Sequence, residues 1–167
     1  MTVALTAVLG TAGGVATAAP ALARGPHWQI VPAAPYTIDA SSCGFAVGVV
    51  PASREFIKVL KTPDGSTISL LTGSLTASLT NLATGRTITE NVSGPGKITT
   101  FPDGTATVAA KGHNGPIVLT PAVAQRSGLP AVSVTAGALT LSLDPSGNIA
   151  SATLHGHVLV DVCAALS

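Results

Sequence analysis

The chain has 167 residues, of which 46% are hydrophobic, 9% are charged and only 3% are aromatic. This length fits one domain after a leader, and a mean hydropathy of +0.54 supplies enough apolar surface to offset the entropy of ordering, which excludes disorder. Eight Lys and Arg against seven Asp and Glu, placed singly along the chain, predict no basic stripe and therefore no nucleic-acid partner.

Residues 1–23 have the pattern of a secretory signal peptide. They contain no charged side chain and end in Ala21-Leu22-Ala23, a small-x-small sequence of the kind that signal peptidase cleaves. The same stretch is just long enough to span a bilayer, so an uncleaved anchor is the alternative, although Pro20 and several glycines weaken it. No basic residue precedes the apolar stretch, so either the Met1 ammonium is its only positive charge or the start codon lies upstream of Met1. We expect a secreted protein with a mature N-terminus at Arg24, and membrane contact only through a retained leader.

Two cysteines, Cys43 and Cys163, lie near the two ends of the mature chain. In an exported protein an even number of cysteines predicts a disulfide, and no Cys-x-x-Cys or Cys/His spacing indicates a metal site instead. The bond would join the first strand to the last and restrict the unfolded chain by about 4 to 5 kcal/mol. The alternative is a pair of buried free thiols.

Residues 24–35 are rich in Pro and Ala and predict an extended arm, and residues 36–167 have the pattern of a single all-β domain. Apolar residues alternate with Thr and Ser in several runs, which predicts strands with one buried face. The clearest runs have their apolar positions at Leu75, Ala77, Leu79, Ala106, Val108, Ala110, Leu139, Leu141 and Leu143.

Turn signals separate these runs at the spacing of an antiparallel meander, because Pro, Asp or Asn, and Gly each favour a turn position. They are Pro63-Asp64-Gly65-Ser66, Ala83-Thr84-Gly85, Gly94-Pro95-Gly96, Pro102-Asp103-Gly104 and Asp144-Pro145-Ser146-Gly147-Asn148. Only 121–128 predicts a short helix, with Pro at its start and Gly at its end. Strand number alone fits a β-sandwich or a closed up-and-down barrel, and the terminal disulfide favours the barrel.

The runs LTGSLTASLTNLATGRTITENVSGPG and DGTATVAAKG resemble sequences of the uncharacterised, secreted, β-rich proteins of the actinobacterial type, over about Cys43 to Cys163. The resemblance rests on residues that shape the backbone, namely Gly73, Thr80-Asn81, Gly85, Ser93-Gly94-Pro95 and Asp103-Gly104. It implies export and a β fold, and it transfers no catalytic residue.

The sequence His155-Gly156-His157 is the sharpest candidate site, because residues two apart on a strand share a face. Asp161 has the same parity, so His155, His157 and Asp161 are a candidate metal set. The alternative is that both histidines are solvated while the intervening apolar residues are buried.

Glu90 lies between Ile88 and Val92 in strict alternation, so it is a candidate interior carboxylate with Arg86 nearby. There it would act as an acid or orient a ligand together with His155 and His157. The alternative is a structural ion pair or an outward-facing strand end.

The motifs GxSxG, SxxK and HExxH are absent, and nothing calls for a cofactor. The leading hypothesis is an exported, non-catalytic β module with a structural or binding role. One alternative is a carrier of a small apolar ligand, because Ala77, Ala106 and Ala110 would leave a barrel cavity open. Another is a barrel isomerase or cyclase that uses an interior Glu90 or His157 as acid or base.

Overall fold

A computed structural model describes residues 27–167, so the predicted leader and the cleavage expected at Arg24 lie outside the described residues. The described residues form ten strands and three short helices, which confirms the all-β prediction. In chain order the elements are β1 (Gln29–Ile30), β2 (Tyr36–Ile38), α1 (Ala40–Cys43), β3 (Val47–Lys61), β4 (Thr67–Asn81), β5 (Thr87–Asn91), β6 (Gly96–Thr100), β7 (Ala106–Ala110), β8 (His113–Val118), α2 (Pro121–Ser127), β9 (Val132–Leu143), β10 (Ile149–Asp161) and α3 (Val162–Leu166).

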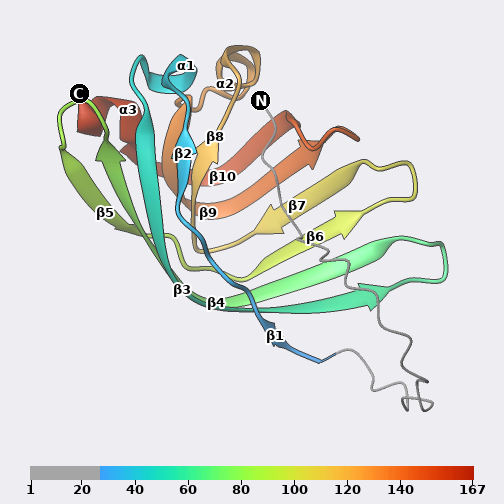
Figure 1. The fold of residues 1–167 in the computed structure, drawn as a ribbon. Coiled ribbons are helices and arrows are strands. Elements are labelled where there is room, and N and C mark those ends of the chain that lie inside the picture. The colour runs from blue at the N-terminus through green and yellow to red at the C-terminus, as the bar shows by residue number, and fades with distance from the viewer. Residues whose placement is uncertain (1–26) are drawn as a thin grey trace, which may run out of the picture.

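The strands form one antiparallel sheet in the order β1-β3-β4-β6-β7-β9-β10, with β2 paired to β3, β5 to β4 and β8 to β9 (Figure 1). Four of the five predicted turn segments fall between strands, whereas Gly94-Pro95-Gly96 forms no turn and its last residue begins β6. The predicted helix is α2, where the Thr120 hydroxyl accepts a hydrogen bond from the Val123 N–H and Gly128 ends the helix in the left-handed region.

The two strands β4 and β9 each pair with two shorter strands along one edge. β6 pairs with the first half of β4 and β5 with its second half, while β8 pairs with the first half of β9 and β7 with its second half. In the described part of the chain, β6 and β7 pair with each other, whereas β5 and β8 do not. The sheet is therefore continuous at the β6–β7 end and divides into two layers at the β5–β8 end.

One hydrophobic core lies between the two layers. Val47, Val49 and Leu79 from β3 and β4 are almost completely buried against Val132 and Val134 of β9. The alternation predicted for β4 is confirmed, because Ala77 and Leu79 belong to this core. Ala77 therefore fills space between the layers and does not open a cavity.

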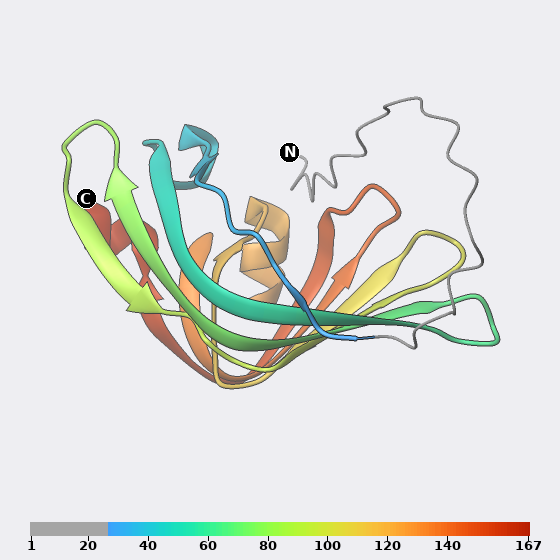
Figure 2. The ribbon, with the colours of Figure 1, turned by 60° about the horizontal axis from the view of Figure 1, so that its bottom comes forward.

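A second core lies inside the curve of the sheet. Leu139 and Leu141 of β9 pack with Val123 of α2, and Leu154 of β10 joins them. Figure 2 shows α2 inside the curve, which makes this the concave face of the sheet. The side chains that alternate with Leu139 and Leu141 therefore point to the opposite, convex face.

Two glycines sit midway along the long hairpins that curve in Figure 2. Gly73 in β4 has φ +133° and Gly137 in β9 has φ +123°. A Cβ added at Gly73 would lie 2.3 Å from the Arg54 carbonyl oxygen, and one at Gly137 would lie 2.4 Å from that of His155. Only glycine permits this backbone conformation and this close strand approach.

The preference for a closed barrel is not supported, because the sheet ends at β1 and β10, which do not pair within the described residues. The physical reason is that β5 and β8 diverge. The two layers then bury their apolar faces by side-chain packing, and no hydrogen-bonded closure is required.

The predicted disulfide is confirmed between Cys43 and Cys163. It joins α1 to α3, however, and not the first strand to the last. Both helices were missed, and β1 lies within the predicted arm, where Gln29 and Ile30 pair with β3. Within residues 27–167 no helix is both long enough and apolar enough to cross a bilayer.

Candidate binding face

Side chains from six neighbouring strands form one row across the convex face. The register places Lys58, Leu70, Lys97, Ala109, Thr140 and Thr153 side by side, from β3 to β10. Lys58 and Lys97 are two strands apart, which corresponds to about 10 Å. The next row on the same face holds Phe56 on β3, Lys111 just after β7 and His155 on β10.

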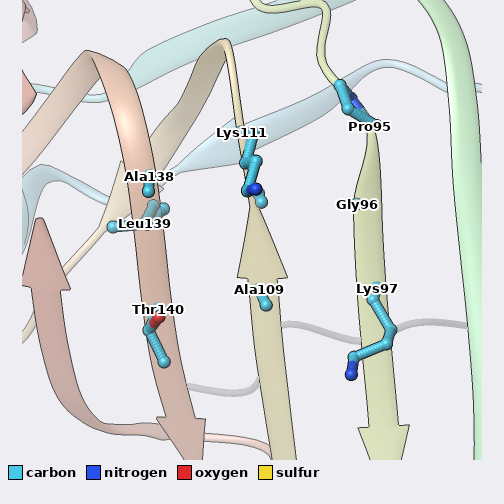
Figure 3. Close-up of a pocket in the computed structure, with 9 residues that line it drawn as sticks. Pro95, Gly96, Lys97, Ala109, Lys111, Ala138, Leu139 and Thr140 are labelled. Carbon is cyan, nitrogen blue, oxygen red and sulfur yellow. The ribbon is translucent and has the colours of Figure 1, made fainter. Parts of the chain in front are cut away.

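A shallow groove of about 320 Å³ lies in the middle of this face. Its lining residues are Pro95, Gly96, Lys97, Ala109, Ala110, Lys111, Ala138, Leu139 and Thr140. Figure 3 shows Lys97 on β6 beside Ala109 of β7, Lys111 further along the chain just after β7, and Thr140 on the neighbouring β9. The register makes the two lysines diagonal neighbours, about 7 to 8 Å apart. The groove thus combines a small-residue floor with two exposed ammonium groups.

The charges of the protein are segregated around this face. Arg54, Lys58, Lys97 and Lys111 are half of the eight lysines and arginines of the chain, and all four occupy convex positions. The seven Asp and Glu side chains of the chain all belong to the described residues, and each lies elsewhere. Three are in hairpin turns (Asp64, Asp103, Asp144), two are at the starts of α1 and α3 (Asp39, Asp161), one is on the opposite face of β3 (Glu55) and one is on β5 (Glu90). No carboxylate therefore neutralises the lysines of the convex rows.

Asp64, Asp103 and Asp144 lie in the turns of the β3–β4, β6–β7 and β9–β10 hairpins, which are neighbours in Figure 1. Hydrogen bonds lower the pKa of each carboxyl group. The largest contribution comes from the Thr62 hydroxyl for Asp64, from the Thr105 hydroxyl for Asp103 and from the Asn148 backbone N–H for Asp144. These carboxylates stabilise turns, as the Pro, Asp and Gly residues of the three segments predict.

The structure separates the predicted metal ligands. His155 and His157 are exposed on the convex face, but the pairing register shifts between Val158 and Val160, so parity no longer relates them to Asp161. The Asp161 carboxylate instead accepts a hydrogen bond from the Ala164 N–H and caps α3. In the part of the chain that the structure describes, no three His, Cys, Asp or Glu side chains are grouped to hold a metal ion.

The structure places Glu90 and His157, the candidate interior acid or base, on β5 and β10. His157 is exposed, and Glu90 lies half-buried on β5 opposite the buried Ala77, within a two-layer packing and not inside a barrel. The Arg86 guanidinium donates a hydrogen bond to the main-chain oxygen of Ser167, 2.6 Å away, which ties β5 to the C-terminus. Burial raises the pKa of a different carboxyl, Glu55, on the concave side of β3.

Sequence reasoning missed Lys97 and Lys111, because they are 14 residues apart and neither belongs to a motif. The turn between them carried a signal. A hairpin centred on Pro102-Asp103-Gly104 pairs Lys97 with Ala109 and thereby makes Lys111 the diagonal neighbour of Lys97.

Comparisons with protein-family models, with curated proteins and with solved structures find no match to this chain.

Proposed function

We propose that the protein is an exported, non-catalytic binding module that holds an anionic ligand on its convex face. The observation that carries this proposal is the charge segregation. Lys58, Lys97 and Lys111 lie on one face of the sheet, and every Asp and Glu side chain lies elsewhere. Bringing like charges together costs free energy in the absence of a partner, and an anion removes that cost.

Export is part of the same proposal. The Cys43–Cys163 disulfide is compatible with an oxidising destination, and the leader pattern supplies a route to it. The mass of protein recovered from culture medium tests this step, because cleavage after Ala23 leaves Arg24 at the N-terminus. Recovery of the protein only in a membrane fraction with Met1 retained would contradict export.

Ligand binding is tested by the salt concentration at which the protein elutes from immobilised heparin, a sulfated polymer. We expect Lys97→Gln and Lys111→Gln to elute at lower salt than the wild type, because each removes a contact charge. Lys61→Gln is the matched control: it removes the same charge from an exposed lysine on the other face of β3. Equal shifts for all three variants would mean that only net charge matters, which would refute the proposal.

A further inference from the structure

A second feature of the convex face is an apolar cluster at the β1 edge of the sheet. Ile30 of β1 pairs with Phe56 of β3, and Trp28 lies two residues before Ile30, so alternation places all three on the face that carries Lys58. Their exposed fractions are 46% for Trp28, 72% for Ile30 and 40% for Phe56. Exposed large apolar side chains are ordinary when single, whereas a cluster that includes two aromatic rings is typical of a contact surface.

The cluster and the groove lie along one line that crosses the strands. Four strand spacings separate β1 from β7, which corresponds to about 19 Å. Lys58 on β3 occupies a position between the two ends, and Lys97 lies at the groove end of the line. A ligand that reaches both ends must therefore be extended, with negative charge distributed along its length.

The side chains along this line match the chemistry of an acidic sugar chain. The C–H groups of a sugar ring pack against the electron-rich face of Trp or Phe, and lysine ammonium groups attract carboxylates without demanding a fixed geometry. Thr140 lines the groove, and Thr99 and Thr107 occupy convex positions beside it; their hydroxyl groups can exchange hydrogen bonds with sugar hydroxyls. An inorganic polyanion would use the lysines alone.

We infer that the ligand of the convex face is an acidic polysaccharide that lies across the strands, from the groove between Lys97 and Lys111 to Trp28 and Phe56. This inference rests on the proposed anion binding and adds to it the class of polymer and the direction in which the polymer crosses the sheet.

Trp28 is the only tryptophan of the chain, so its fluorescence reports directly on the β1 end of the line. The probes are polygalacturonate, the galacturonate monomer and inorganic polyphosphate, each titrated into the exported protein. We expect polygalacturonate to change the Trp28 emission, and the monomer to bind too weakly to do so at the same galacturonate concentration. Polyphosphate should bind through the lysines and leave the emission unchanged.

Variants distinguish polysaccharide binding from general anion binding. Phe56→Ala should weaken polygalacturonate binding roughly three- to tenfold, as expected for the loss of one aromatic contact, and should leave polyphosphate binding unchanged. Phe101→Ala is the matched control, because Phe101 is equally exposed at 40% but lies at the β6–β7 turn, away from the line. Lys97→Gln combined with Lys111→Gln should weaken the binding of both polymers.

The outcomes distinguish the two proposals. Polygalacturonate binding that Phe56→Ala leaves unchanged, or wild-type protein that binds polyphosphate but not polygalacturonate, would overturn the polysaccharide inference while anion binding stands. Undiminished binding of both polymers by the double lysine variant would overturn the proposed function itself.

Discussion

The close strand approach at Gly73 gives a sharp test of whether this position in the β3–β4 hairpin requires glycine. In Gly73→Ala, the new Cβ would meet the Arg54 carbonyl oxygen at 2.3 Å and the Glu55 Cα at 2.7 Å, both of them backbone atoms. Its φ of +133° also lies where a side chain is rarely tolerated. Such a conformation costs about 1 to 3 kcal/mol by itself, and relief of the clash requires the β3–β4 hairpin to move, so we expect a total loss of about 3 kcal/mol or more.

Gly85→Ala provides the comparison, because Gly85 also has a positive φ, +77°, but a Cβ there meets nothing within 4 Å. That variant should lose only about 1 to 2 kcal/mol, the cost of the left-handed conformation. Urea denaturation of the oxidised proteins, with linear extrapolation to water, measures both free energies of unfolding. If Gly73→Ala loses no more than Gly85→Ala, the backbone contact at Gly73 does not constrain the hairpin, and our conclusion that this position requires glycine is wrong.

Three further predictions concern stability. Cys43→Ala combined with Cys163→Ala opens a loop with a sequence separation of 120 and should lower the free energy of unfolding by about 5 kcal/mol; a loss below about 2 kcal/mol in urea would contradict the entropic account. Ser133→Ala removes a completely buried hydroxyl that has no hydrogen-bond partner, so thermal unfolding should show no loss and a gain of up to about 1 kcal/mol, whereas a clear loss would indicate a partner. The pKa of Asp103 is lowered in the folded state, so its stabilising effect is present above its unfolded pKa and disappears as the pH falls through the folded value. Asp103→Asn should therefore lose less stability than the wild type between about pH 4 and pH 2. Free energies of unfolding that fall in parallel with pH for both proteins would refute this.

Local sequence chemistry predicted the strands and turns because each depends on a few adjacent residues. The Pro63-Asp64-Gly65-Ser66 turn shows this, since the Asp64 carboxylate accepts hydrogen bonds from the Ser66 N–H and hydroxyl inside the segment itself. Alternation likewise identified Leu79 and Leu141 as core residues, because period two alone decides which side chains share a face.

Apart from the disulfide, which two cysteines can form in only one way, features that depend on two distant segments were missed. The division into layers follows from β5 and β8 taking different partners, which no local pattern specifies. Near the C-terminus, Val158, Val160 and Val162 alternate as if in one strand, but a bulge intervenes and Val162 begins α3. The same bulge separated Asp161 from the histidines, whereas the lysines of the groove came together through a hairpin register that parity within one strand does not show.

The unequal ends of the sheet also imply an unequal distribution of rigidity. Where the sheet is divided, the layers pack face to face, the disulfide connects α1 to α3, and the Asn81 amide donates a hydrogen bond to the Leu166 carbonyl oxygen. Among residues 27–167, no such support covers β3 at the continuous end, where Val59 remains 45% exposed on the concave side. Opening fluctuations should therefore begin in the hairpin arms that carry Lys58 and Lys97 and stop at the divided end. A surface of this kind can change its twist to follow an irregular polymer without unfolding the rest of the molecule.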